Sequence, residues 1–179
     1  MGAQKVYQSL TLLWLLYLQE IMAIKSLEVL SHRCNHNTIY FDEFNISIIE
    51  NRISCEMKTK IKIPAGITFH ISLERGLSRN GTYNTFFKYD IDFCRVISSS
   101  RNNLLKRWTL SLAKHGKIPS RCPWPAGQYY VRDWLLSHDL VPQFVVSGYY
   151  KSKVMSHLGI VGSESFELLY HCEVTSKLI

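Results

Sequence analysis

Apolar and polar residues alternate along much of the chain, as expected for β-strands that bury one face. The alternation is clearest from Ile53 to Ile63, where the odd positions hold Ile, Cys, Met or Thr and the even positions hold Ser, Glu or Lys. Side chains of a strand point to opposite faces in turn, so the lysine-bearing face must lie in solvent. We therefore predict a half-buried strand over this segment.

Other segments show the same period, separated by turn-forming residues such as Pro64-Ala65-Gly66. The further predicted strands are Thr38–Ile49, Ile67–Arg75, Tyr83–Ile91, Tyr129–Leu136, Gly148–His157 and Phe166–Val174. The segment Ile24–Asn37 is polar and irregular, and no strand is predicted there. Strands do not alternate with helices, so we predict an all-β fold, an antiparallel immunoglobulin-like β-sandwich.

One segment, Arg101–Lys117, has a helical period instead. Its apolar face is formed by Leu104, Leu105, Trp108 and Leu112. A serine just before it can cap the helix, and Gly116 can end it. We expect one short helix, placed between Cys94 and Cys122, which an exported chain would be expected to join.

The N-terminus has the pattern of a signal peptide. Lys5 precedes the apolar run Leu10–Leu18, and Ala23 ends a small-residue site. The run is too short to span ~30 Å of hydrocarbon. We predict that residues 1–23 are removed and that the protein is secreted; a signal anchor and a buried N-terminal helix are the alternatives.

The chain is basic, with 21 Lys and Arg against 14 Asp and Glu and a net charge of +7. The charges are spread along the chain rather than gathered in a block, and nucleic acid is not an expected partner of an exported protein. Anionic lipid head groups, or the acidic face of a membrane receptor or channel, suit this charge better.

Five cysteines follow Ala23, namely Cys34, Cys55, Cys94, Cys122 and Cys172. In an oxidising compartment they predict disulfides. Because the number is odd, one thiol stays free and buried or pairs between chains. Two Asn-x-Ser/Thr sequons make Asn45 and Asn80 candidate glycosylation sites.

No local motif of a known catalytic or nucleotide-binding site occurs, and we predict no enzyme activity, metal or cofactor. His32 and His36 flank Cys34, but a disulfide at that cysteine is favoured over a metal site. Asp90 and Asp92 could form an acid–base pair. We expect instead that at least one of them binds backbone amides at the end of a strand.

Aromatic residues are concentrated in one third of the chain, close to predicted loops. They are Trp108, Trp124, Trp134, Phe144, Tyr129 and Tyr130. Ordinary core packing can explain any single one. As a group they indicate a pocket for an apolar ligand, with Trp108, Trp124, Trp134 and Phe144 at its mouth.

The second half of the chain carries a specific order of landmarks. They are Phe93-Cys94, the helical segment, Cys122-Pro123-Trp124, Gly127 with Tyr129, Pro142 with Phe144, Gly148 with Tyr149 and Tyr150, and Cys172. This order resembles the ganglioside-activator group of the MD-2-related lipid-recognition (ML) family. It is closer still to the insect chemosensory CheB proteins.

The resemblance implies that residues 24–179 form one ML-like domain, a cup-shaped sandwich that holds an apolar ligand. It also implies the disulfides Cys34–Cys172 and Cys94–Cys122, with Cys55 left as a buried thiol. The expected function is that of a secreted, monomeric, non-catalytic carrier of a lipid, hydrocarbon or pheromone in chemosensation. A module that docks on a receptor or channel, and a lipid-presenting activator of a hydrolase, are the alternatives.

Overall fold

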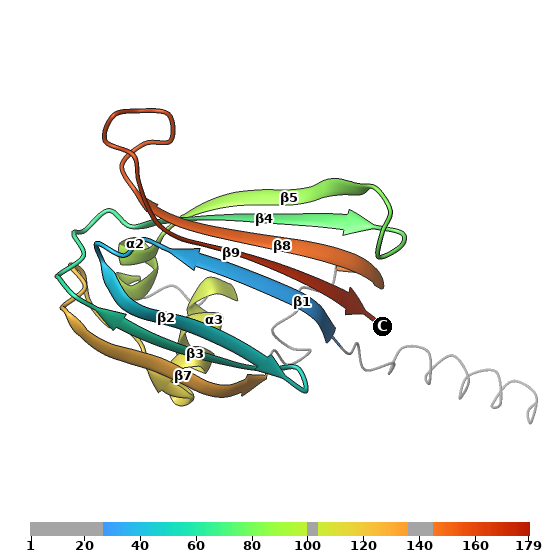
Figure 1. Ribbon diagram of the computed structural model, residues 1–179, viewed down its shortest axis with the longest axis horizontal. Helices are drawn as coiled ribbons and strands as arrows, with labels where there is room; N and C mark the ends of the chain where they lie inside the picture. Colours follow the sequence, from blue (N-terminus) through green and yellow to red (C-terminus); the bar gives the residue numbers. More distant parts are fainter. Residues whose placement is uncertain (1–26, 100–103, 136–144) are drawn as a thin grey trace, which may run out of the picture.

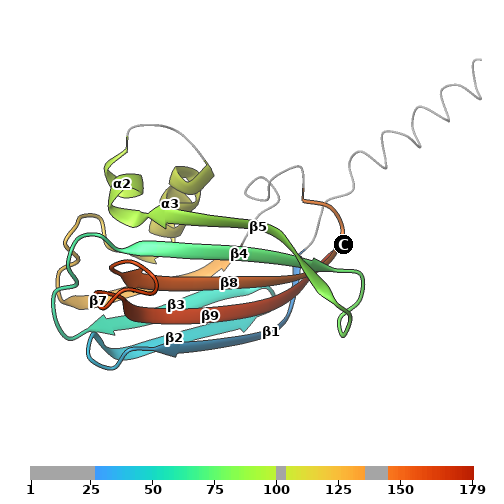
Figure 2. The same ribbon diagram turned by 90° about the horizontal axis from the view of Figure 1, so that it is seen from above.

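A computed structural model describes residues 27–99, 104–135 and 145–179, and shows two antiparallel sheets that lie one over the other (Figures 1 and 2). The first sheet has the order β1 (Leu27–His36), β9 (Glu167–Leu178), β8 (Gly148–Leu158), β4 (Thr68–Gly76) and β5 (Tyr83–Asp92). The second has the order β2 (Phe41–Ile49), β3 (Arg52–Thr59), β7 (Gly127–Leu135) and β6 (Gly116–Lys117). The predicted all-β antiparallel sandwich is confirmed. The predicted signal segment 1–23 and Phe144 lie outside the described residues.

The strand predicted from Ile53 to Ile63 is shorter than expected. β3 ends at Thr59, and Ile63 instead forms an isolated bridge with Trp124, with backbone N–H groups donated in both directions at 3.0 Å. Ile63 is fully buried, whereas Ile61 is exposed. The alternation therefore predicted the strand but not its end. Ile63 leaves the strand because it pairs with Trp124, which is remote in sequence.

β1 was missed by the sequence pattern and pairs with β9 along its whole length. Its register shifts between Val29 and Ser31, so the apolar residues do not keep a single period of two. Past the shift, Cys34 lies directly opposite Cys172, and the two form a disulfide. β1 is therefore the edge strand of the first sheet, although its sequence shows no regular alternation.

Two helices stand where one was predicted. β5 ends at Asp92, whose carboxylate accepts a hydrogen bond from the Arg95 N–H at 3.0 Å and so caps α2 (Phe93–Ser98). The predicted helix is α3 (Leu104–Lys114). Cys94 belongs to α2, and its disulfide with Cys122 ties that helix to the loop before β7.

The buried apolar residues fall into three clusters. The first lies at the end of the sandwich marked by α2 and includes Phe41, Ile63, Ile67, Trp124 and Leu169. The second lies where α3 packs on β7 and is centred on Val131 and Trp134. The third lies at the C-terminal end and contains Val145, Tyr150 and Leu178. Cys172, near the middle of β9, belongs to the first cluster. Ile71, Val154 and Val174, in contrast, belong to none of the three.

Candidate ligand site between the sheets

Many inner-facing side chains at the strand centres are only half-buried. Ile71, Val154 and Cys172 are neighbours across β4, β8 and β9, and Cys172 belongs to the core, which identifies this as the inner face. Inner-facing residues that remain only half-buried include Ile46, Ile53, Cys55, Met57, Ile71, Val154, Tyr170 and Val174. Five of them pack against the edges of the first or second core cluster. A closely packed interior would bury such residues fully. These residues keep solvent-accessible surface although they face the opposite sheet.

Tyr170 of β9 and Cys55 of β3 lie on the inner faces of opposite sheets. The Tyr170 ring stacks on Phe44 at 4.7 Å between ring centroids, which joins the two sheets. Burial raises the pKa of the Cys55 thiol to about 11, and it raises the pKa of Tyr170 strongly, with a further contribution from Cys55. Both residues are therefore largely surrounded by protein, yet each side chain keeps some solvent-accessible surface. Deep residues with accessible surface are those that line an internal space.

The sandwich is open along β5. Phe87 and Tyr89 are paired with Leu73 and Ile71 of β4, so they belong to the inner face. They are nevertheless 40% and 58% exposed. β5 is the last strand of its sheet, whereas β1 at the other edge lies beside β2 (Figure 1). The inner face is thus covered on the β1 side and accessible on the β5 side.

Helix α3 covers part of the second sheet on this open side. Trp108 and Leu112 pack against Val131 and Trp134 of β7. The indole Nε1–H of Trp134 donates a hydrogen bond to the Ser111 hydroxyl at 3.0 Å. The helix is therefore held to the inner face of the second sheet by an apolar contact and one directed hydrogen bond.

The three described tryptophans that were predicted at a cavity mouth do not form one group. Trp124 is 3% exposed and packs edge-to-face on Phe93 at 5.1 Å, so it belongs to the core at the α2 end. Trp134 is also buried, and Trp108 is half-buried beside it. The structure brings Trp108 and Trp134 together under α3 and places Trp124 in a different cluster. Trp124 and Trp134 are buried core residues, covered by side chains remote in sequence, and a position at a cavity mouth stays a prediction.

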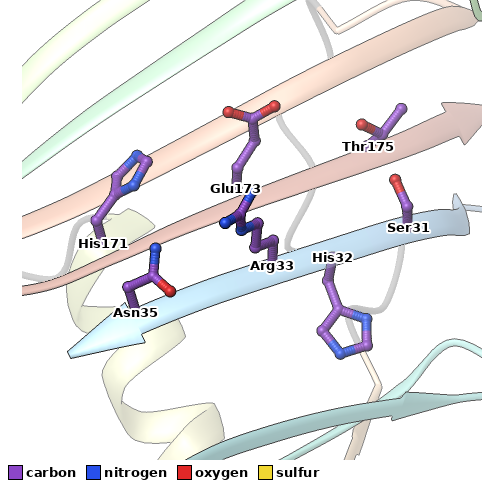
Figure 3. A pocket seen from close by; sticks show the side chains of 7 residues that line it. All are labelled: Ser31, His32, Arg33, Asn35, His171, Glu173 and Thr175. Atoms are coloured by element: carbon purple, nitrogen blue, oxygen red, sulfur yellow. The ribbon is translucent and has the colours of Figure 1, made fainter.

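A second hollow, of about 480 Å³, lies on the outer face of β1 and β9 (Figure 3). Three cross-strand pairs line it, Ser31 with Thr175, Arg33 with Glu173, and Asn35 with His171. Such polar pairs are the ordinary composition of a solvated sheet face. Figure 3 also shows His32 pointing the other way, and its Nε2 lies 3.2 Å from the Ile46 carbonyl oxygen.

The candidate carboxylate pair is divided between two structural roles. Asp92 caps α2, as expected for one member of the pair, and Asp90 lies 2.6 Å from Nδ1 of His70 on the outer face. Over the described ranges, no three His, Cys, Asp or Glu side chains are close enough together to hold a metal ion.

The two sequons lie on the surface. Asn45 is exposed on β2, and Asn80 is exposed in the loop between β4 and β5. Within the part of the chain that the structure describes, no helix has the length and apolar character needed to cross a membrane.

Residues 67–152 match the model of a family described as a protein of unknown function (DUF1091). The match spans just under half of the chain, from β4 into β8, and includes the Phe93-Cys94 and Cys122-Pro123-Trp124 landmarks. In insects this family is known as an ML-like domain, which agrees with the resemblance to the ML family. The closer resemblance to the CheB proteins is not tested by this match. No curated protein matches the chain.

Proposed function

We propose that this protein is a secreted, non-catalytic carrier that binds an apolar ligand between its two sheets. The observation that supports the proposal most directly is the half-buried state of apolar residues at the strand centres, such as Ile71, Val154 and Val174. These side chains face inward between three separate core clusters. A hydrocarbon chain would complete their burial, and the exposed inner face of β5 offers an entry.

The energy available is sufficient for useful affinity. Burial of one methylene contributes about 0.8 kcal/mol, so a chain of a dozen contributes about 10 kcal/mol in gross terms. Loss of ligand freedom and ordering of side chains offset several kcal/mol of this. The balance corresponds to micromolar or tighter binding.

Secretion is part of the same proposal. The disulfides Cys34–Cys172 and Cys94–Cys122 suit an oxidising compartment, and the exposed sequons at Asn45 and Asn80 suit passage through the secretory pathway. A chemosensory setting, with a pheromone or cuticular hydrocarbon as ligand, rests on the resemblance to the CheB proteins.

One feature favours the alternative of a docking module. The loop between β8 and β9 projects from the sandwich (Figure 1) and presents Ile160 and Val161, which are 74% and 60% exposed. Such residues on a projecting loop suit contact with a receptor or channel. This alternative needs no internal space, so a test of the interior separates the two functions.

The test fills the interior by substitution. Val174→Trp places a large ring on the inner face of β9, and Thr175→Trp places the same ring on its outer face as a control. We expect Val174→Trp to lower uptake of a neutral fluorescent probe by about tenfold, or about 1.4 kcal/mol, with little change in unfolding temperature. The Thr175→Trp control should bind the probe with the affinity of the wild-type protein.

Native mass spectrometry of the secreted protein, followed by solvent extraction, should show a co-purified apolar molecule. A wild-type protein that takes up no apolar probe, together with a Val174→Trp variant that unfolds for lack of space, would overturn the carrier function in favour of docking.

A further inference from the structure

Tyr170 carries a polar group that the protein leaves without a partner. Within the described residues its hydroxyl makes no hydrogen bond, although the ring is held by Phe44 at 4.7 Å and contacted by Phe41 and Phe69. A deep tyrosine usually finds a hydrogen-bond partner, because an unpaired buried hydroxyl is costly. The other deep tyrosines follow that rule: Tyr40 donates to Glu167, Tyr129 to Pro125 and Tyr150 to Val146.

Tyr170 belongs to the inner face of the first sheet. It lies on β9, two residues before Cys172, and its pKa is influenced by Cys55 on the opposite sheet. It is also only half-buried, so room remains beside it. A group that occupied this room could accept the hydrogen bond of the phenol.

The chemistry around the hydroxyl selects a neutral group. None of the described inner-facing residues at the strand centres carries a charge. Arg75 donates to the Ser147 carbonyl oxygen at 3.0 Å and keeps a buried Nε without a partner. However, it lies six residues along β4 from Phe69, which shares the row of Tyr170. A carboxylate placed beside Tyr170 and Cys55 would be buried without a counter-charge, which is strongly unfavourable. An alcohol, ester or ketone oxygen would meet no such cost.

We propose that the ligand is a neutral long-chain molecule with one oxygen-bearing group, and that this group lies innermost and accepts a hydrogen bond from the Tyr170 hydroxyl. The inference rests on the proposed carrier function and deepens it. The hydrocarbon part would then extend past Val154 and Val174 toward the open side at β5.

The experiment compares hexadecanol, hexadecane and palmitate as competitors of a neutral bound dye, N-phenyl-1-naphthylamine. Tyr170→Phe removes only the hydroxyl. We expect Tyr170→Phe to weaken the binding of hexadecanol about five- to tenfold, as for loss of one hydrogen bond. The affinity for hexadecane should change by no more than about twofold. Palmitate should bind wild-type protein at least about tenfold more weakly than hexadecanol at neutral pH.

Tyr130→Phe, on the outer face of β7, is the matched control and should change neither ligand. A second readout is alkylation of the Cys55 thiol, which hexadecanol should slow in the wild type. If Tyr170→Phe affects hexadecanol and hexadecane equally, or if palmitate competes as well as hexadecanol, the assignment of Tyr170 is wrong while the carrier function stands. If none of the three displaces the dye and the dye itself does not bind, the carrier function fails as well.

Discussion

The two long sides of this sandwich differ although both are built from alternating strands. Along the β1 side, the His36 ring lies 5.9 Å from Phe44 of β2, and Cys34 is bonded to Cys172. Along the β5 side, seven consecutive residues, Asn84–Asp90, are exposed, so both faces of the strand are accessible. β5 alternates from Phe87 to Ile91, as β3 does along its length, but no described strand of the second sheet covers it.

The comparison teaches that an alternating pattern predicts a strand, whereas its burial depends on what lies opposite. On the β1 side, ring contacts of His36 and Tyr170 with Phe44 join the two sheets. The Cys34–Cys172 disulfide joins β1 to β9 within the first sheet. The β5 side presents apolar residues that a closed sandwich would bury. Stability should therefore depend on the first side and ligand access on the second.

Loss of the disulfide on the closed side should have the largest effect. Cys34 and Cys172 are 138 residues apart, and Cys94 and Cys122 are 28 apart. On the chain-entropy model, removal of the first bond costs up to about 5 kcal/mol and removal of the second up to about 3.5 kcal/mol. Double alanine variants of each pair, unfolded in urea, measure both. An equal or reversed order would contradict the role given to the β1 side.

Trp124 should behave as a core residue. We expect Trp124→Ala to lower the free energy of unfolding by about 3–5 kcal/mol, because it removes a large buried ring that packs on Phe93. Tyr89→Ala on the open side should cost about 0.5 kcal/mol or less. Denaturant unfolding of the two variants is the measurement. A Trp124→Ala protein of normal stability and impaired ligand uptake would restore the mouth position first predicted.

Cys55, midway between the two sides, should make stability depend on pH. Its pKa is raised by burial to about 11, above the ordinary value of 9.0, so the folded state retains the thiol proton longer than the unfolded state. The stabilisation is complete below pH 9 and is lost as the pH rises toward 11. Wild-type protein should lose roughly 2 kcal/mol more than Cys55→Ala across this window. Parallel pH profiles of the two proteins would show that the thiol is not deeply buried.

Glycosylation should have the smallest effect on either side. Asn45→Gln and Asn80→Gln should each remove one glycan mass from secreted protein and change stability by about 0.5 kcal/mol or less, because both side chains are exposed. Intact-mass measurement before and after amidase treatment tests each site. A mass shift that depends on Asn45 alone would contradict the greater exposure expected for the Asn80-Gly81 turn.

Local patterns predicted most of the strands and the helix α3, since side-chain period is a local property. They missed β1 because its register shift breaks the period, and they missed α2 because six residues are too few for a helical period. The role of Asp92 could be anticipated from its position at a strand end. The candidate site was harder: aromatic residues pointed to Trp124 and Trp134, which are core, and gave no signal for Tyr170.

The sequence by itself determined the strand alternation, the position of α3 and the number of cysteines available for pairing. Only the tertiary structure decided that Cys34 lies opposite Cys172, that Tyr170 stacks on Phe44 and that β5 remains uncovered. These features depend on register and on the stacking of sheets, which join residues more than a hundred positions apart in the case of Cys34 and Cys172. Period and composition depend only on the order of residues in the chain. The burial of a side chain depends on which element of the opposite sheet packs against it.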